Sequence, residues 1–186
     1  MRIPSWLAIL ALTGLATAAF PQPPQSRADP PLLHERLRDE SALVRSYAEQ
    51  ALWLLWSRSG NDEIDRLMAR GTEAMQAGEH REAIRTFSDV IRAKPEFAEG
   101  WNRRATVYYL AGEFERSIAD CQEVLKRNPR HFGALSGLGQ IYSQLEEWRK
   151  ALDWYRRALE VNPNMLGVEM NVRMIEEKLR EPRRTL

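Results

Sequence analysis

Three prolines spaced by 34 residues constrain this chain more than any other feature of its sequence. They are Pro95, Pro129 and Pro163. When the sequence is divided at these prolines, three consecutive rows of residues align column by column. Self-similarity at a fixed period of this size is typical of repeat arrays, in which each unit buries its apolar face against its neighbours. The sequence therefore predicts an array of stacked units.

The aligned columns hold large and small residues at the spacing of helices. In each half of a row they fall at i, i+4 and i+7, which is one face of a helix. The small residues let two antiparallel helices approach closely, and the large residues fill the space between them. The columns are Leu67, Trp101 and Leu135; Gly71, Ala105 and Gly139; Ala74, Tyr108 and Tyr142; Ala83, Ser117 and Ala151; Phe87, Cys121 and Tyr155; and Val90, Val124 and Ala158.

A turn is predicted in the middle of each row. Gly78 and Gly112 stand where the first helix must end and the chain must reverse, as a residue with positive φ does after a helix. The third row has Glu146 at this position, which is a less favourable residue for that backbone conformation. The proline at the end of each row prevents a longer second helix. Each row is therefore predicted to be a helix–turn–helix.

The three rows resemble tetratricopeptide repeats, and the resemblance covers units at 64–97, 98–131 and 132–165. It implies an all-α fold, a right-handed solenoid of antiparallel helix pairs. The sequence departs from the family pattern at a few positions. Arg70 and Arg104 replace a leucine, and we expect these exchanges to thin the packing of the first two units. Ala74 replaces an aromatic residue, with the same expected effect.

Residues 32–60 form a predicted N-terminal helical segment. In the 34-residue frame, Trp53 and Trp56 of this segment fall in the columns of Phe87 and Val90. We therefore expect a degenerate repeat that packs on the first unit, with its indole rings in the core. The alternative is that the two tryptophans form an exposed binding site, which would make a large apolar patch.

Residues 166–180 form a predicted capping helix, and 181–186 form a basic tail. A solenoid needs its last open face covered by an atypical helix with a polar outer side. The apolar stripe expected to face the repeats consists of Met165, Val168, Val172, Ile175 and Leu179.

Residues 1–19 are predicted to be a secretory signal peptide. A positive charge at Arg2 precedes an uncharged apolar run and the small residues of Ala16-Thr17-Ala18, a pattern typical of cleavage sites. A proline-rich linker is predicted at 20–31. The segment ALWLLWSRSGNDEID also resembles part of small secreted bacterial repeat proteins, which implies a location in the periplasm. The alternative is a membrane tether through an uncleaved signal.

Composition and motifs argue against several classes of function. The 27 Lys and Arg residues and 26 Asp and Glu residues are interspersed, so nucleic acid is not an expected partner. The lone cysteine, Cys121, excludes an intramolecular disulfide and is expected to be buried and inert. No metal or cofactor is expected, because His34, His80 and His131 lack ligand spacing. No small-molecule substrate is expected either.

The resemblance places the first helix of each unit on the concave side of the solenoid. The residues beside the core columns would then form a groove for an extended peptide. In this groove amides would pair with the peptide backbone, and Arg103 would meet a carboxylate. The Lys/Asn/Arg clamp of some family members is expected to be absent, since Met68, Thr72, Gly133 and Gly137 occupy clamp positions. The groove residues are Met68, Thr72, Met75, Gln76, Asn102, Arg103, Thr106, Tyr109, Ser136, Gln140, Ser143 and Gln144.

The sequence thus favours a non-enzymatic interaction scaffold of the bacterial cell envelope that binds a protein or peptide. Three alternatives stay open. The groove residues could be a solvated face or be covered by a segment of the same chain. The end helices could assemble copies into a homo-oligomer. An enzyme is disfavoured, because the chain carries no Gly-x-Ser-x-Gly, His-Glu-x-x-His or phosphate-binding glycine loop.

Overall fold

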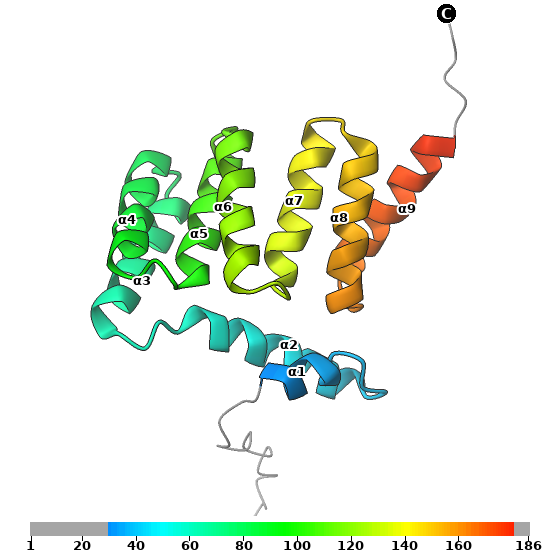
Figure 1. Ribbon diagram of the computed structural model, residues 1–186, viewed down its shortest axis with the longest axis horizontal. Coiled ribbons are helices and arrows are strands. Elements are labelled where there is room, and N and C mark those ends of the chain that lie inside the picture. The colour runs from blue at the N-terminus through cyan, green and yellow to red at the C-terminus, as the bar shows by residue number, and fades with distance from the viewer. Residues whose placement is uncertain (1–29, 181–186) are drawn as a thin grey trace, which may run out of the picture.

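The structure is a computed structural model that describes residues 30–180 (Figure 1). Within this range the chain is helical, with no strand, and each helix from α3 to α9 packs against the next one along the chain. The predicted all-α solenoid of helix pairs is confirmed. The helices are α1 (Pro30–Arg36), α2 (Ala42–Ser57), α3 (Asp62–Gln76), α4 (His80–Ala93), α5 (Ala98–Leu110), α6 (Phe114–Arg127), α7 (Phe132–Gln144), α8 (Trp148–Val161) and α9 (Leu166–Arg180).

The turns inside the three helix pairs have the left-handed backbone that the sequence predicts. Gly78 and Gly112 both have φ 75°, and Glu146 has φ 57°. Glu146 is the one non-glycine residue with positive φ in the described part of the chain. A side chain in this conformation is strained, because its Cβ approaches the following carbonyl oxygen. The third turn therefore has the same shape as the other two at a higher conformational cost.

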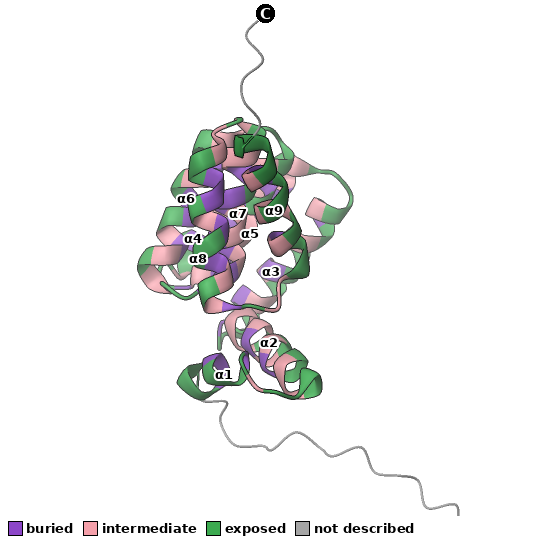
Figure 2. Cartoon of the chain, turned by 90° about the vertical axis from the view of Figure 1, so that its right-hand side faces the viewer, coloured by how far each residue is buried: buried purple, intermediate pink, exposed green. Residues whose placement is uncertain are grey.

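The predicted large and small columns meet inside each pair, in contacts that we call the seams. At Gly71 an added Cβ would lie 2.6 Å from the ring of Phe87, and at Gly139 it would lie 2.5 Å from the ring of Tyr155. Both rings are buried. In the second pair the same columns hold Ala105 and Cys121, which share one apolar cluster. The seams are therefore the core of the array, and Figure 2 shows the buried residues gathered between the helices.

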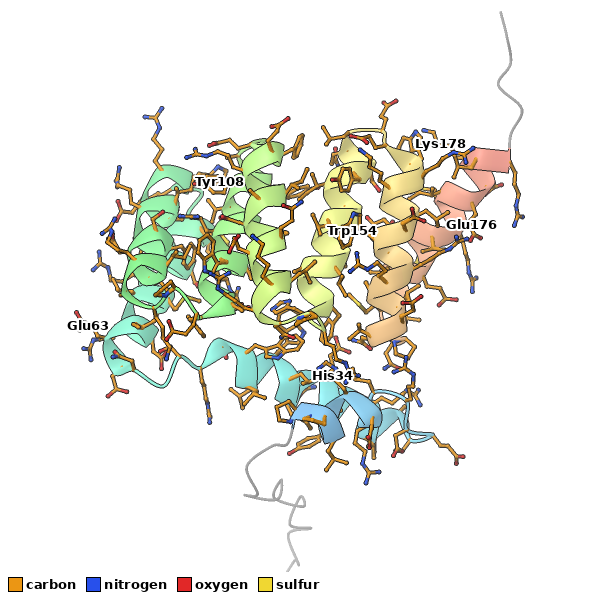
Figure 3. All side chains as sticks on the ribbon, in the orientation of Figure 1. His34, Glu63, Tyr108, Trp154, Glu176 and Lys178 are labelled. Carbon is orange, nitrogen blue, oxygen red and sulfur yellow. The ribbon has the colours of Figure 1, made fainter. Side chains whose placement is uncertain are left out.

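Helix α9 covers the last face of the array, against α8. Val168 and Ile175 are buried there. Arg156 donates to Glu176 at 2.7 Å, and the Lys178 ammonium lies 3.8 Å from the ring centroid of Trp148 (Figure 3). Met165 and Val172 are partly buried in the same cluster. Leu179, which we expected in this stripe, is instead 40% exposed.

Helices α1 and α2 form an N-terminal hairpin whose position differs from the prediction. The hairpin does not stack on the first unit: it lies along the edge of the array, below the ends of the repeat helices (Figures 1 and 2). Leu37 and Leu52 pack against Phe132, Val161 and Met165, which belong to the second half of the array.

The short length of α1 explains this placement. Its seven residues are about half the length of the first helix in each repeat, so α1 and α2 cannot form a full unit that stacks on α3. Their apolar side chains are buried against the edge instead. Pro30 and Pro31, predicted to belong to the linker, form the first turn of α1, where proline is well tolerated.

Polar contacts fasten the hairpin to the edge of the array. The Asn164 side-chain amide donates to the Leu37 carbonyl at 2.7 Å, and the Arg38 guanidinium donates to the Glu160 carbonyl. Trp53 and Trp56 are half-buried between the hairpin and the loop before α7, with Trp53 edge-on to Phe132. The indole rings pack against a buried apolar cluster, as expected for core residues, but the expectation that this segment packs on the first unit is wrong.

The signal peptide prediction (1–19), nearly all of the linker prediction (20–29 of 20–31) and the tail (181–186) lie outside the described residues. Among the helices that the structure describes, none combines the length and the hydropathy that a membrane crossing requires.

Candidate functional site

A small hollow lies between α5 and α7, on the side where the sequence predicts a groove. Its volume is about 70 Å³. Four of the predicted groove residues line it: Asn102, Thr106, Tyr109 and Gln140. The other lining residues are Ala105, Ser117, Cys121, Gly133, Gly137 and Ile141. None of the described residues that line this α5–α7 hollow carries a charge.

Two glycines of α7 shape the hollow in different ways. At Gly137 an added Cβ would have a single near neighbour, the Cys121 Sγ at 3.8 Å, so the missing side chain leaves open space. At Gly133 an added Cβ would lie 2.5 Å from the Trp53 ring, so the missing side chain allows α2 to approach. Gly137 thus leaves space at the hollow, and Gly133 allows the N-terminal hairpin to pack closely against α7.

The floor of the hollow is apolar and chemically unreactive. Ala105, Cys121 and Ile141 are buried in one cluster. Burial, with a smaller contribution from the Asp120 charge, raises the pKa of the Cys121 thiol to about 12. The thiol is therefore protonated at neutral pH and behaves as a small apolar group.

Most hydroxyl groups of the predicted groove already donate a hydrogen bond to their own helix. Thr72 donates to the Met68 carbonyl at 2.8 Å, and Thr106 donates to the Asn102 carbonyl at 3.0 Å. Ser136 donates to the Gly133 carbonyl and Ser143 to the Gly139 carbonyl, at 3.0 and 2.9 Å. Their oxygens can still accept a hydrogen bond, so this surface offers acceptors more than donors.

Arg103 is not a free cation. Its Nε donates to the Glu99 carboxylate at 2.7 Å, and the Glu99 side chain is fully buried. The same carboxylate accepts from the Asn102 amide at 3.0 Å and lies 3.3 Å from the His131 Nε2. Because the His131 Nδ1 accepts from the Ala134 N–H, the ring proton lies on Nε2 and points at Glu99.

This buried network connects the groove side of α5 to the N-terminal hairpin. Trp56 stacks on His131 with the ring centroids 4.4 Å apart, and Trp53 meets the same ring edge-on at 5.5 Å. We expected Arg103 to be available for a ligand carboxylate, but its charge offsets that of Glu99. The spacing of four residues between Glu99 and Arg103 was a signal that sequence reasoning missed.

The predicted groove residues of the first unit lie away from the hollow. Met68 is 8% exposed and belongs to the core cluster with Ile64 and Phe87, so its assignment to the groove surface is wrong. Met75 packs partly against the same cluster, Thr72 is half-buried and Gln76 is exposed.

The predicted groove residues of the third unit have mixed positions. Ser136 and Ser143 are half-buried, and Gln140 and Gln144 are exposed. Of these four, Gln140 lines the hollow. The structure therefore brings together a subset of the predicted groove, centred on α5 and α7.

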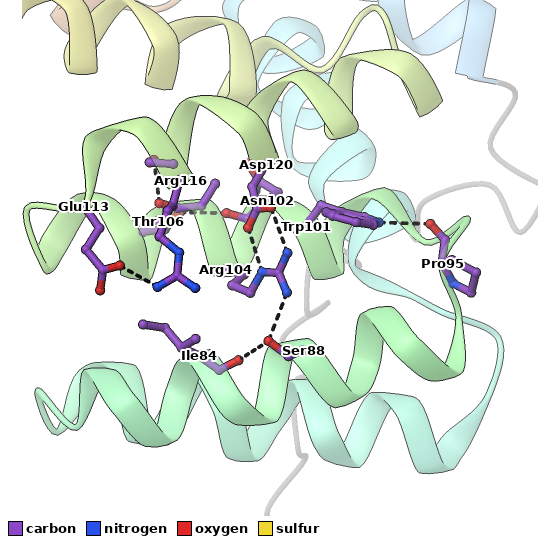
Figure 4. A network of polar contacts seen from close by, with 12 residues as sticks. Ile84, Ser88, Pro95, Trp101, Asn102, Arg104, Thr106, Glu113, Arg116 and Asp120 are labelled. Carbon is purple, nitrogen blue, oxygen red and sulfur yellow. Dashed lines mark hydrogen bonds and ion pairs between the residues drawn. The ribbon is translucent and has the colours of Figure 1, made fainter.

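Arg104 has a structural role that the sequence did not reveal. We expected it to thin the packing. Instead, its guanidinium binds the Asp120 carboxylate through two hydrogen bonds of 2.7 and 2.8 Å and donates to the Ser88 hydroxyl at 2.9 Å (Figure 4). It also lies over the ring of Trp101, 5.2 Å from the centroid. Arg104 thus joins α4, α5 and α6.

Comparison with known proteins identifies the repeat. A family model described as tetratricopeptide repeat matches residues 96–164. The chain contains tetratricopeptide repeats. A TPR repeat-containing protein of Rhizobium etli is 33% identical over 87 residues, which are 47% of this chain. The chain spans 42% of the length of that relative.

Solved tetratricopeptide repeat domains share the fold. The first TPR of Spaghetti (RPAP3), bound to the HSP90 peptide SRMEEVD, has a TM-score of 0.62 at 24% identity and covers 64% of this chain and 95% of its own. The TPR2B domain of yeast Sti1, in a complex with pHsp70, has a TM-score of 0.59 at 19% identity and covers 63% and 99%. At these identities the likeness concerns the fold of the repeats.

No three His, Cys, Asp or Glu side chains within residues 30–180 are grouped to hold a metal ion. The arrangement around the α5–α7 hollow offers amides, acceptor oxygens and an apolar floor, which are suited to binding.

Proposed function

We propose that this chain is a non-enzymatic interaction scaffold that binds an extended protein or peptide segment along the concave groove, over the α5–α7 hollow. The observation that carries the proposal is the hollow itself, where four predicted groove residues surround open space above an apolar floor. One solved domain with the same fold is bound to a peptide and another is in a complex with pHsp70, which supports a partner of this class. The high pKa of Cys121 argues against thiol catalysis at this place.

We place this scaffold in the bacterial cell envelope. The support is the sequence of residues 1–19, with its short apolar run and small-residue cleavage pattern. The test is the mass of the protein released from its native cells by osmotic shock. A released protein that begins within a few residues of Ala19 supports export with cleavage, and a protein found only in the cytoplasm with Met1 intact would overturn it.

The groove hypothesis is tested by two substitutions and one control. Tyr109→Ala removes a partly buried ring from the wall, and Gln140→Ala removes an exposed amide from the rim. Gln122→Ala is the matched control, because Gln122 is exposed on α6, outside the hollow. Partners are first identified by proximity labelling in the native envelope, and their capture by purified variants is then measured.

We expect Tyr109→Ala and Gln140→Ala to lower partner capture at least tenfold. Capture by the Gln122→Ala control and the helical content of all three variants should stay at the wild-type level. Equal capture by all three variants would show that the partner binds elsewhere. A loss caused by Gln122→Ala alone would point to the α6 face.

A second candidate function is self-assembly through α9. Opposite its buried face, α9 carries a second apolar stripe of Leu166, Met170 and Met174, which are 72%, 70% and 54% exposed. Such a stripe on a surface helix is typical of an interface. Light scattering on the wild type and on Met170→Lys tests it, with Leu43→Lys, at a leucine 84% exposed on α2, as the control. Dissociation by Met170→Lys alone supports assembly, and a monomeric wild type would exclude it.

A further inference from the structure

We propose that the α5–α7 hollow is a selectivity pocket that takes one compact, uncharged apolar side chain of the bound segment and does not bind a carboxylate. This inference rests on the proposed function, since it names the chemistry that the groove selects. Size, polarity, charge and the position of Gly137 each support it.

The size of the hollow fits an aliphatic side chain. Its volume is about 70 Å³. An engineered cavity of about 150 Å³ accommodates a benzene ring, and a single water needs on the order of 10–15 Å³. The hollow is therefore large enough for a side chain of the size of valine or leucine and too small for an indole ring.

The polarity of the floor favours an apolar group. A side chain that enters the hollow meets the Ala105 methyl group, the Cys121 thiol and the Ile141 side chain, all of which are buried. Moving an ionised group to such a surface without a partner is strongly unfavourable, whereas an aliphatic group is stabilised in proportion to the apolar area removed from water.

The rim can hold the backbone of an extended segment on both sides of that side chain. The Asn102 amide nitrogen is engaged by Glu99, which leaves the amide oxygen to accept a peptide N–H. The exposed Gln140 amide faces the hollow from α7 and can donate and accept. One amide on each wall is the arrangement that an extended chain requires, because its N–H and C=O groups alternate in direction.

The nearest cation does not favour a carboxylate ligand. Arg103 is 34% exposed and bound to Glu99, whose buried charge it offsets. A ligand carboxylate at Arg103 would compete with Glu99 and leave that buried charge without its partner, which is strongly unfavourable. The local charge balance is therefore already complete before a ligand binds.

Gly137 controls the open space. Because an added Cβ would have the Cys121 Sγ as its single near neighbour, at 3.8 Å, a substitution here starts without a clash and directs its side chain into the hollow that Gly137 lines. Gly167 on α9 provides a matched control, since it is also helical and an added Cβ there would meet no atom within 4 Å. The same substitution can thus be placed at one site that fills the hollow and at one that does not.

The experiment uses four libraries of N-acetylated, C-amidated nine-residue peptides with a fixed central Leu, Asp, Lys or Gly. Binding to the full chain is followed by the amide NMR shifts of Gly137 and Gln140 and by the apparent Kd. We expect the Leu library to bind at least tenfold more tightly than the Asp library. We also expect Gly137→Leu to abolish this preference and Gly167→Leu to preserve it, with unchanged circular dichroism in both variants.

The outcomes distinguish a failure of the selectivity pocket from a failure of the proposed peptide-binding function. A tighter Asp library, or an unchanged Leu preference in Gly137→Leu, would overturn the selectivity pocket while peptide binding at the groove stands. Libraries that leave every amide of α5 and α7 unshifted would overturn the proposed function and, with it, this inference.

Discussion

The seams within the repeats and the contact between the N-terminal hairpin and the array use the same device, a ring packed against glycine. In the first seam the Phe87 ring lies against Gly71, and at the hairpin the Trp53 ring lies against Gly133. The seam joins two helices that are adjacent in sequence, whereas Trp53 and Gly133 are separated by the first two repeats.

The two contacts also differ in how much of each is buried. The ring and the glycine of the first seam are both buried, and Phe87 has no exposed surface. The hairpin contact is half-exposed at Trp53 and Trp56 and shares its packing with His131, which also holds Glu99. We therefore expect the repeats to unfold as one unit and the hairpin to detach before them, because local opening begins where fewer apolar groups are buried.

Removal of a seam ring is the change with the largest expected effect. Phe87→Ala leaves a cavity inside the first repeat, and we expect a loss of about 3–5 kcal/mol in the free energy of unfolding. Urea denaturation followed by circular dichroism measures it. Phe114→Ala, at a half-buried ring of α6, is the control and should cost clearly less. Equal losses would show that the seams are not the main source of stability.

Acid is expected to detach the hairpin through His34. Burial, and then the charges of Arg130 and Arg38, lower the pKa of this buried imidazole to about 4, from 6.5 in the unfolded chain. The unfolded chain therefore binds a proton between pH 6.5 and pH 4 that the folded chain does not, and stability falls as the pH falls through this window. We expect a loss of about 2–3 kcal/mol at pH 4.5 relative to pH 7.

Denaturation followed by indole fluorescence at the two pH values measures this loss. His34→Phe is the diagnostic variant, because a phenyl ring packs in the same place and does not titrate. We expect the pH dependence of the variant to be smaller by the amount assigned to His34. The same loss in both proteins would assign the acid sensitivity to other groups.

Adding a side chain at Gly133 is expected to have a moderate effect on stability. In Gly133→Ala the new methyl group would displace the Trp53 ring, and we expect a net loss of about 1–2 kcal/mol, limited to the hairpin. Hydrogen exchange of the α2 amides reports it. Gly137→Ala is the matched control, with room for its methyl group, and should gain up to about 1 kcal/mol from helix propensity. Identical α2 exchange in both variants would contradict the docking contact.

The smallest expected effect is at the third turn. Glu146→Gly removes the Cβ from a residue with φ 57°, and we expect a gain of roughly 0.5–1 kcal/mol. Thermal unfolding measures this gain. Glu147→Gly, at the next residue and without a positive φ, should give no gain. A destabilised Glu146→Gly variant would show that the side chain contributes more than its backbone strain costs.

The sequence predicts the parts of the fold that repeat. Gly78, Gly112 and Glu146 share a column because the backbone turns in the same way three times, and Phe87 and Tyr155 share one because each meets a glycine. The hairpin has no repeated partner, so nothing in the 34-residue frame indicates that Trp56 stacks on His131. For this reason, alignment to the 34-residue period predicted the wrong contacts for the two indole rings.

The candidate site was predictable in part. The columns predict that Asn102, Thr106, Tyr109 and Gln140 lie on one side of the array, and all four line the hollow. The hollow itself depends on the absence of a side chain at Gly137. A single sequence does not show where such an absence leaves space in the fold. Met68 was misplaced because its position beside the core column lies inside the cluster with Ile64 and Phe87, and the 34-residue columns do not show how wide the buried face of α3 is.

Site-specific photo-crosslinking in the native cells tests the central claim most directly. A benzophenone side chain is placed at Gln140, on the rim of the hollow, or at Gln122, on the exposed side of α6. The account predicts an adduct with a partner protein from position 140 alone, joined within an uncharged apolar segment of that partner. Adducts from position 122 with none from position 140, or adducts joined within an acidic segment, would contradict it.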